Sequence, residues 1–209
     1  MKKMMIAAMA LLLTTSCMTA QEVRTLPQPA TGEVKMTLMD ALRLRSSERE
    51  FDSSRAVDDQ TLANILWAAC GISRPESGKI TAASAINAQD IQVYVCTAQG
   101  AWLWQPKENV LQKVCDKDLR KAIAARQESV AAAPVSLVLV SDQSKFGGRG
   151  NGETYGCMDA GYVSQNIYLA CTAMGLKTVA RAMMMKDDVA EGLKLSENQV
   201  LMLNHPIGY

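Results

Sequence analysis

The sequence has little of what a histidine-based metal site or a nucleic-acid-binding surface requires. It contains one histidine, His205, and none of its six cysteines belongs to a Cys-x-x-Cys pair. Zinc sites are built from closely spaced cysteines and histidines, so the sequence argues against one. Aromatic residues make up 5% of the chain, the formal net charge is +1, and there is no basic block. These absences also argue against a nucleic-acid-binding protein.

The composition is that of an ordinary globular domain. Hydrophobic residues make up 48% and charged residues 21% of the 209 residues, which excludes wholesale disorder. This length suits one domain with a sizeable core. Helical and strand patterns alternate along the chain, and one pair of strands forms a hairpin. We therefore expect an α+β fold, or an α/β fold with an antiparallel component.

The first 20 residues predict an export signal. Lys2 and Lys3 precede an apolar run of ten residues, 4–13. That run is shorter than the roughly 20 residues that span a bilayer, but it is typical of a signal-peptide core. We expect an exported protein, either periplasmic with cleavage before Gln21, or a membrane-anchored lipoprotein with its lipid on Cys17. Without residues 1–20 the charge becomes 20 basic minus 21 acidic residues, or −1.

Five cysteines follow this segment and are widely spaced, several of them in apolar runs. The preferred interpretation is that they pack as small hydrophobic side chains. In an oxidising compartment, an odd number also permits one or more disulfides with a leftover thiol. They are Cys70, Cys96, Cys115, Cys157 and Cys171.

Residues 21–35 contain Pro27 and Pro29 without periodicity, so we expect an extended N-terminal arm ahead of a domain of residues 36–209. A helix is predicted from Thr37, where Thr37 and Asp40 form a pair resembling a capping box. Leu38, Ala41 and Leu42 form its apolar face. Further helices are predicted over residues 58–70, 119–127, 157–174 and 187–193. Glycines end the helix 58–70 and the helix 157–174.

Strands are predicted over residues 91–97 and 101–105, which form a hairpin, and over residues 135–141, 178–183 and 200–204. The segment 135–141 is almost continuously apolar, as in a strand that is buried on both faces. Trp102 and Trp104 lie on one face of their strand, and we expect them to pack in the core rather than to stack on a ligand. Residues 71–79 and 146–155 are predicted loops.

Residues 45–51, with the sequence RSSEREF, are a candidate phosphate site. They place Arg45 and Arg49 close to Ser46 and Ser47, and guanidinium groups and hydroxyls are the donors that bind phosphate oxygens. The alternative is a solvated turn in which nearby glutamates pair with the arginines. Taken alone, the segment does not decide between the two interpretations.

Four segments in the same order resemble motifs of the nitroreductase family of FMN-dependent oxidoreductases, particularly its SagB-type dehydrogenase branch. The resemblance covers residues 37–209. The segments are Arg45-Ser46-Ser47-x-Arg49-x-Phe51, residues 83–89 with the sequence ASAINAQ, the stretch from Gln127 to Pro134, and Asp159-x-Gly161-x-x-x-Gln165-Asn166.

The resemblance implies an α+β fold in which a central, mostly antiparallel or mixed sheet is flanked by helices, and which forms an intertwined homodimer. It also implies two FMN sites at the subunit interface. The phosphate group would be held by Arg45, Ser46, Ser47 and Arg49 of one chain. The other chain would contribute Ser84, Asn87 and Gln89.

Two further positions of the resemblance concern the flavin ring. Gln127 matches a family position near the polar edge of the flavin. Arg181 stands where the family often has a small or acidic residue with glycine. It would either place positive charge near the flavin, which favours the anionic reduced form, or be solvated. No protein residue need act as a catalyst, because the hydride chemistry belongs to the flavin N5.

The activity that this resemblance implies is an FMN-dependent, nitroreductase- or dehydrogenase-like oxidoreductase with a ping-pong cycle. A small-molecule donor would reduce the flavin, and a nitroaromatic, a quinone or a similar small acceptor would reoxidise it. The alternative is an exported flavin-binding or structural protein of the same fold without redox turnover. The departures at Ala83 and Met183 and the export signal motivate that alternative.

Overall fold

The computed structural model describes residues 22–209, so the predictions for the signal segment and Cys17 lie outside the described residues. A seven-stranded sheet has the order β1-β6-β5-β4-β7-β9-β8, and every pairing in it is antiparallel. The predicted α+β class with a mostly antiparallel sheet is confirmed. The strands are β1 Val23–Thr25, β4 Ile91–Thr97, β5 Gly100–Gln105, β6 Val110–Cys115, β7 Val135–Asp142, β8 Lys177–Thr178 and β9 Gln199–Gly208.

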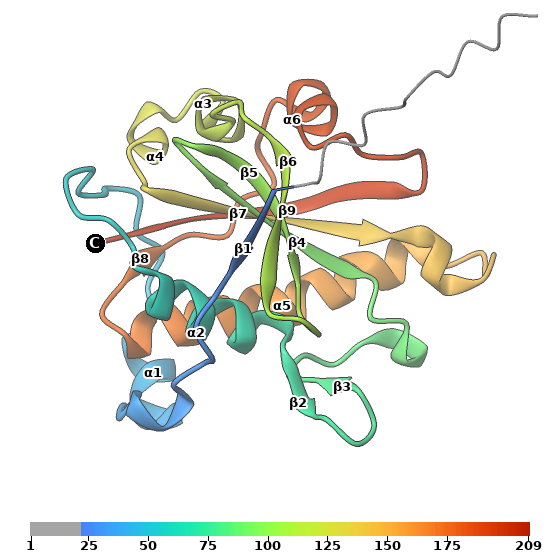
Figure 1. Ribbon diagram of the computed structural model, residues 1–209, viewed down its shortest axis with the longest axis horizontal. Helices are drawn as coiled ribbons and strands as arrows, with labels where there is room; N and C mark the ends of the chain where they lie inside the picture. The colour runs from blue at the N-terminus through green and yellow to red at the C-terminus, as the bar shows by residue number, and fades with distance from the viewer. Residues whose placement is uncertain (1–21) are drawn as a thin grey trace, which may run out of the picture.

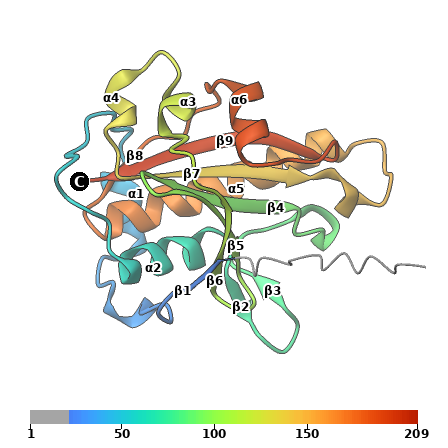
Figure 2. The same ribbon diagram turned by 45° about the horizontal axis from the view of Figure 1, so that its top comes forward.

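Helices cover both faces of this sheet (Figures 1 and 2). One face carries α1 Leu38–Leu44, α2 Asp59–Cys70 and α5 Gly152–Ala173, and the other carries α3 Arg120–Ala124, α4 Glu128–Ala131 and α6 Lys186–Gly192. A hairpin of β2 Ile72–Arg74 and β3 Lys79–Ile80 projects from the end of α2 (Figure 1). Short 3-10 turns occur at Thr31–Glu33, Ala85–Asn87 and Gln143–Phe146.

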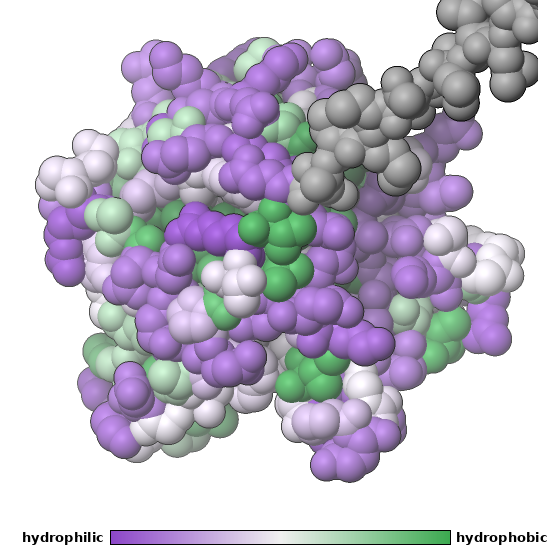
Figure 3. Space-filling model, viewed as in Figure 1, coloured by the Kyte–Doolittle hydropathy of each residue, from purple (hydrophilic) through white to green (hydrophobic). Residues whose placement is uncertain are grey.

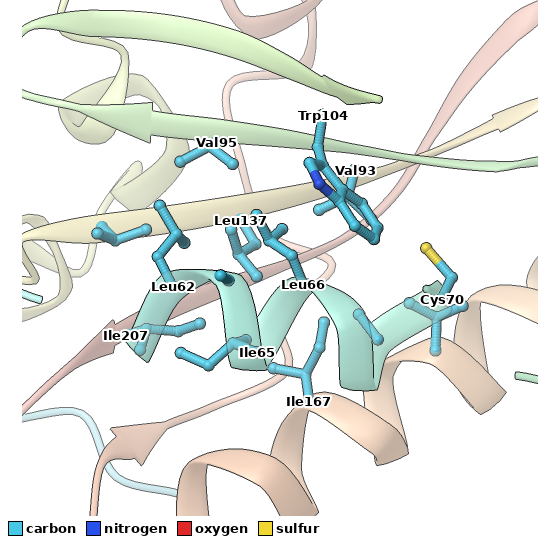
Figure 4. Close-up of a cluster of buried hydrophobic side chains, with 14 of the residues drawn as sticks. Leu62, Ile65, Leu66, Cys70, Val93, Val95, Trp104, Leu137, Ile167 and Ile207 are labelled. Carbon is cyan, nitrogen blue, oxygen red and sulfur yellow. The ribbon is translucent and has the colours of Figure 1, made fainter. Parts of the chain in front are cut away.

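The central strands β4 and β7 are mostly apolar because both of their faces are buried. Side chains alternate across a strand, so Val93 and Val95 of β4 pack towards α2 and α5, while Tyr94 and Cys96 pack towards α3 and α6. Figure 4 shows Leu62, Leu66 and Ile167 meeting the first set. Full burial of one such side chain stabilises the fold by about 1.5–3 kcal/mol, so this two-sided packing holds the sheet between its helices.

The predicted cap of α1 and the predicted glycine end of α2 at Gly71 are present, and Asp58 adds an N-terminal cap to α2 that was not predicted. Thr37 Oγ1 accepts from the backbone N–H of Asp40 at 3.1 Å, and Asp58 Oδ1 accepts from the N–H of Thr61 at 2.7 Å. The predicted apolar face of α1 is not buried, however. Ala41 is its one buried residue, whereas Leu38 and Leu42 are 63% and 46% exposed. Part of this helix surface is therefore open to a further partner.

The long helix α5 begins five residues earlier than predicted, at Gly152. Gly156 lies inside it, where a Cβ would fall 2.5 Å from Ser141 Oγ of β7. The glycine therefore permits a close approach of helix and sheet, which a local pattern does not reveal. Ala160, Val163, Ile167 and Cys171 are buried as predicted.

Strands β1 and β6 were not predicted. The N-terminal arm packs against the domain: β1 pairs with β6, and Asn109 Nδ2 donates to the carbonyl oxygens of Leu26 and Pro27. Ala30 N–H donates to Asn64 Oδ1 of α2 at 2.7 Å. The arm lacks periodicity because the body of the protein supplies its hydrogen-bond partners.

Several predicted boundaries differ from the structure. The helix predicted over 119–127 ends at Ala124, because Ala125 has a positive φ of 52° and starts a turn into α4. Strand β8 has two residues, followed by a single bridge between Arg181 and Asn204, instead of six. Strand β9 continues beyond the predicted 204 to Gly208. The loop predicted over 71–79 contains most of the β2–β3 hairpin.

The tryptophans and most cysteines belong to the core. Trp102 and Trp104 are each 4% exposed, which confirms packing as their role. Cys70, Cys96 and Cys171 are buried, Cys115 is half-buried and Cys157 is exposed. All five are free thiols in the described structure.

Candidate functional site

The segment 45–51 follows α1 and lies against the C-terminal half of α5. The Glu48 N–H donates to the carbonyl oxygen of Thr178 at 3.0 Å. Ser47 Oγ is 2.8 Å from the hydroxyl of Tyr168, a residue of α5, and the Arg45 guanidinium lies over the Tyr168 ring at 5.0 Å from its centroid. These contacts fix the backbone of the segment and leave its charged groups pointing outwards.

The two arginines of this segment are available to an anion. Neither Arg45 nor Arg49 makes an ion pair or a side-chain hydrogen bond within residues 22–209, and Glu48 bonds to Ser46 Oγ at 2.8 Å. The local pairing with glutamate that a solvated turn would have is therefore not formed. A hollow of about 290 Å³ beside the segment is lined by Ser46, Glu48 and Lys177, and by neither arginine.

Arg181 is buried, so of the two alternatives given for it, the solvated one is wrong. It is 6% exposed. Its Nε donates to Gln127 Oε1 at 2.7 Å, its Nη1 donates to Ile123 O and Asn204 Oδ1 at 3.0 and 2.9 Å, and its Nη2 donates to Ala124 O at 2.8 Å. Four of its five N–H donors are thus used: two hold the end of α3, one binds Gln127 and one binds Asn204 of β9.

The charge of Arg181 is not balanced by a carboxylate in the described structure. Burial lowers its pKa, and the nearby positive charge of Arg49 lowers it further. Two cations that repel one another are an arrangement that a bound anion stabilises. The guanidinium groups of Arg45 and Arg49 therefore fit a dianionic phosphate group, which supports the phosphate interpretation of residues 45–51. The hydroxyls of Ser46 and Ser47, which bond to Glu48 and Tyr168, would turn to the phosphate when it binds.

Ser84, Asn87 and Gln89 lie in another place, on a loop against the N-terminal half of α5. Ser84 Oγ donates to Asp159 Oδ2 at 2.9 Å and accepts from the Gln89 N–H at 2.8 Å. Ile86, Asn87 and Gln89 have positive φ values of 51°, 57° and 49°. Such values are costly for residues with a Cβ, so the loop 84–89 is held in a strained shape.

The structure brings some of the predicted residues together and keeps the others apart. Arg45, Ser46, Ser47 and Arg49 lie near the Gln127–Arg181 pair, because Tyr168 touches Ser47 and also accepts from the N–H of Ala180. The loop 84–89 is bound at Asp159, nine residues earlier on α5, or about 14 Å along the helix axis. One chain therefore does not join the two predicted halves of the site.

Several residues of the site were missed by sequence reasoning. Tyr168 and Asn204 position the segment 45–51 and Arg181, and nothing in their local sequence distinguishes them. Asp159 was recognised as part of a motif but not as the anchor of the loop. A carboxylate on an otherwise apolar helix face is the sequence signal that could have identified Asp159 as an anchor.

His205 has a structural position beneath the same region. It is fully buried, and its ring nitrogens lie 2.8 Å from Ser164 Oγ and 3.0 Å from Thr178 Oγ1. Burial lowers its pKa to about 3, so the ring is neutral. Across residues 22–209 no group of three or more metal-ligating side chains is placed to hold a metal ion. The same residues include no helix with the length and apolarity needed to cross a membrane.

Solved structures share this fold. A crystal structure from Ralstonia eutropha, assigned as a nitroreductase, superposes with a TM-score of 0.83 at 33% identity, covering 91% of this chain and 90% of that one. A chain of the E. coli microcin synthetase complex has a TM-score of 0.70 at 18% identity, over 98% of this chain and 84% of its own. That second likeness concerns the fold alone.

The fold and the sequence relatives define the class as an oxidoreductase. The model of the nitroreductase family matches residues 42–209. A relative from Methanocaldococcus jannaschii, named as a nitroreductase, is 31% identical over 193 residues, which is 86% of this chain and 93% of the relative. The chain belongs to the nitroreductase family.

Proposed function

We propose that the protein is an FMN-dependent oxidoreductase that passes electrons from a small-molecule donor to a nitroaromatic, a quinone or a similar small acceptor. The observation that carries this proposal is the presence of two guanidinium groups, Arg45 and Arg49, that make no ion pair within residues 22–209, with Arg49 close to the buried charge of Arg181. This charge is concentrated beside hydroxyl donors, as binding of a phosphate monoester requires.

The residues have distinct roles in this proposal. Arg45, Arg49, Ser46 and Ser47 hold the phosphate, and the side-chain amide of Gln127, oriented by Arg181, meets the polar edge of the ring. Hydride transfer at the flavin N5 is the chemistry that FMN supplies when bound. The protein binds and orients, and donor and acceptor use the same site in turn, in a ping-pong cycle.

We also propose that the site is completed in a homodimer. On α5, Met158 and Tyr162 are 54% and 51% exposed, and Gly161 and Gln165 are exposed on the same face. Two antiparallel α5 helices crossing near this face would bring the partner subunit's loop 84–89 to the Tyr168 end of the first chain. Ser84, Asn87 and Gln89 would then reach the flavin from the second subunit. Light scattering of the purified protein tests the dimer.

A visible absorption spectrum tests the proposed function. The expected result is the flavin bands, either in the purified protein or after FMN is added and free FMN is removed, with bleaching by a reductant and recovery with a quinone. Protein that retains no flavin after such addition would refute the proposal.

The alternative is a flavin-binding protein of the same fold without turnover. It is favoured by one observation, that Arg181 and Gln127 use their side chains on each other and on the end of α3. Steady-state oxidation of a reduced nicotinamide with a quinone as acceptor decides between the two. Flavin that stays bound while turnover is absent selects the alternative.

Export of the protein is a separate proposal, supported by the sequence of residues 1–20. The mass of the mature N-terminus in periplasmic and membrane fractions tests it. A lipidated Cys17 in the membrane fraction indicates a lipoprotein, an N-terminus at Gln21 indicates ordinary cleavage, and intact Met1 in the cytoplasm refutes export.

A further inference from the structure

Two buried carboxyl groups lie beneath the loop 84–89. Asp90 precedes β4 and is 0% exposed, and Asp159 of α5 is 1% exposed. Both lie at the same loop: Asp159 binds Ser84 Oγ and the Ala85 N–H at its start, and Asp90 directly follows its last residue, Gln89. A hydrogen bond to the carboxyl group of Asp159 raises the pKa of Asp90. Asp90 Oδ1 is buried without a donor in the described part of the chain. Two carboxylates are both acceptors, so a hydrogen bond between them requires a proton on one of the two.

Asp90 of this pair is held by a serine of β7. Ser141 Oγ donates to Asp90 Oδ2, and the Gln143 side-chain amide donates to Ser141 Oγ at 2.7 Å. The absence of a Cβ at Gly156 leaves space for Ser141 Oγ against α5. Asp90 Oδ2 therefore has its donor, and the oxygen that lacks one is Oδ1.

Asp159 of this pair holds the loop 84–89. Both carboxyl oxygens of Asp159 accept from the Ala85 N–H, at 2.9 and 3.0 Å, and Oδ2 also accepts from Ser84 Oγ. Ser84 Oγ in turn accepts from the Gln89 N–H at the other end of the loop. One carboxylate thus ties both ends of a segment with three unfavourable φ values, whose shape depends on that anchor.

We propose that Asp90 is a positioning residue for the cofactor: by sharing one proton with Asp159, it holds the loop 84–89 in the shape that binds flavin. This inference rests on the proposed function, in which Ser84, Asn87 and Gln89 contact the flavin. Asp90 acts through Asp159 and through the loop. Flavin binding is consequently tied to the protonation of a buried pair that the flavin does not touch.

The charges around the pair favour retention of the proton. Burial raises the pKa of Asp90 to about 6, the bond from Ser141 lowers it, and Asp159 raises it. From α2, the buried thiol of Cys70 faces the pair, and its own pKa is raised to about 12 by burial and by Asp90. Asp142 follows Ser141 on β7, and Lys145 lines a hollow of about 210 Å³ with Cys70 and Gln89. The largest influences on the pKa of Asp90 include no lysine or arginine.

Ionisation of both members would place two negative charges side by side away from water, which separates the carboxyl groups and releases the loop. If the loop binds flavin only with the proton in place, the apparent affinity falls as pH rises above about 6. The expected slope is a loss of about tenfold for each pH unit.

Flavin affinity measured by fluorescence quenching between pH 5 and 8 tests this inference. Riboflavin is titrated beside FMN, because a phosphate monoester itself ionises near pH 6 and riboflavin has no phosphate. The variants are Asp90→Asn, whose amide donates to Asp159 and whose oxygen accepts from Ser141, and Ser141→Ala. The matched control is Asp142→Asn, a neighbouring carboxylate that bonds to Ser144 in the loop after β7.

The wild type and the control are expected to lose riboflavin affinity with rising pH, and Asp90→Asn to keep the same affinity throughout. Ser141→Ala removes the bond that lowers the pKa of Asp90, so its transition moves to higher pH. A variant that only loosened the structure would weaken binding equally at every pH, and this result would overturn the inference.

The remaining outcomes separate this inference from the proposed function. A wild type that binds flavin with no pH dependence for riboflavin, or an Asp90→Asn variant with the slope of the wild type, overturns the role of the shared proton alone. A wild type that binds neither flavin at any pH overturns the proposed function and this inference with it. If Asp90→Asn does not fold, the direction of the shift in Ser141→Ala decides.

Discussion

The segment 45–51 and the loop 84–89 use charge in opposite ways. The first keeps two guanidinium groups near the surface without an ion pair to any carboxylate of residues 22–209, and is held by contacts to Tyr168 and Thr178. The second has no charged residue of its own and is held by a carboxylate buried beneath it. An exposed charge costs little to maintain and is available to a ligand, whereas a buried charge is expensive and must be satisfied by the fold.

This difference predicts whether a substitution in each region changes ligand binding or folding stability. Removing a cation from the segment 45–51 should affect ligand binding and leave folding nearly unchanged. Removing the anion beneath the loop 84–89 should affect folding first. Figure 3 shows one face of the molecule, which is mostly hydrophilic with smaller hydrophobic areas. Exposed charged residues outside both regions can therefore serve as controls.

The largest effect is expected for Asp159→Ala. The substitution leaves the Ala85 N–H and Ser84 without their acceptor and Asp90 without its hydrogen-bond partner. Breaking a buried charged network of this kind costs about 3–5 kcal/mol. Denaturant unfolding at pH 7 measures the loss, and Asp188→Ala on the exposed face of α6 should change stability by less than about 0.5 kcal/mol. A loss for Asp159→Ala as small as that of the control would refute the buried anchor.

The next effect is a difference in pH dependence between the wild type and Asp90→Asn. The pKa of Asp90 is raised from 3.8 to about 6, so the folded state holds an extra proton between those values and stability falls as pH rises through that window. Asp90→Asn removes this loss and should be more stable than the wild type by about 2–3 kcal/mol above pH 6, and equal to it below about pH 4.

His205 provides an internal check on that experiment. Its pKa is lowered from 6.5 to about 3. Between these pH values the unfolded state binds a proton and the folded state does not, so stability falls as pH drops below 6.5. In the wild type the two slopes oppose one another between pH 4 and 6. In Asp90→Asn the histidine acts alone, with about 1.4 kcal/mol per pH unit. Unfolding curves for both proteins that run parallel across this range would contradict the assignment.

A smaller effect is expected for Arg45→Ala, and it falls on binding. Loss of one charged hydrogen bond to phosphate should weaken FMN affinity by about 2 kcal/mol, or roughly thirtyfold, with little loss of stability. Arg43→Ala is the matched control, since Arg43 is two residues away, on α1, and pairs with Asp40. Equal flavin occupancy in the two variants would remove Arg45 from the site.

The smallest effect is expected for Tyr168→Phe. The phenylalanine keeps the ring beneath Arg45 but leaves the Ala180 N–H and Ser47 Oγ without the hydroxyl. The cost is about 1 kcal/mol in thermal or denaturant unfolding. Tyr155→Phe on the same helix keeps the ring contact with Phe146 and should behave as the wild type. A Tyr168→Phe variant as stable as Tyr155→Phe would show that this hydroxyl does not hold the segment.

Local patterns determined much of the fold. The glycine end and apolar spacing of the helix at residues 58–70, the apolar run at 135–141 and the buried face of residues 157–174 were all assigned from sequence. Each of these elements places its own side chains at regular intervals against the core. The segment 45–51 was likewise recognisable, because its donors are adjacent in the chain and need no other element to gather them.

Tertiary structure alone decided the contacts between distant segments. The docking of β1 on β6, the burial of Arg181 against the end of α3 and the pairing of Asp90 with Asp159 join residues whose local sequences carry no trace of one another. The physical reason is that a buried polar group is specified by the partner that satisfies it. The sequence determined which segments fold as helix or strand and where the cations lie, and the packing decided which cations stay without an ion pair among residues 22–209 and which carboxyl group has a raised pKa.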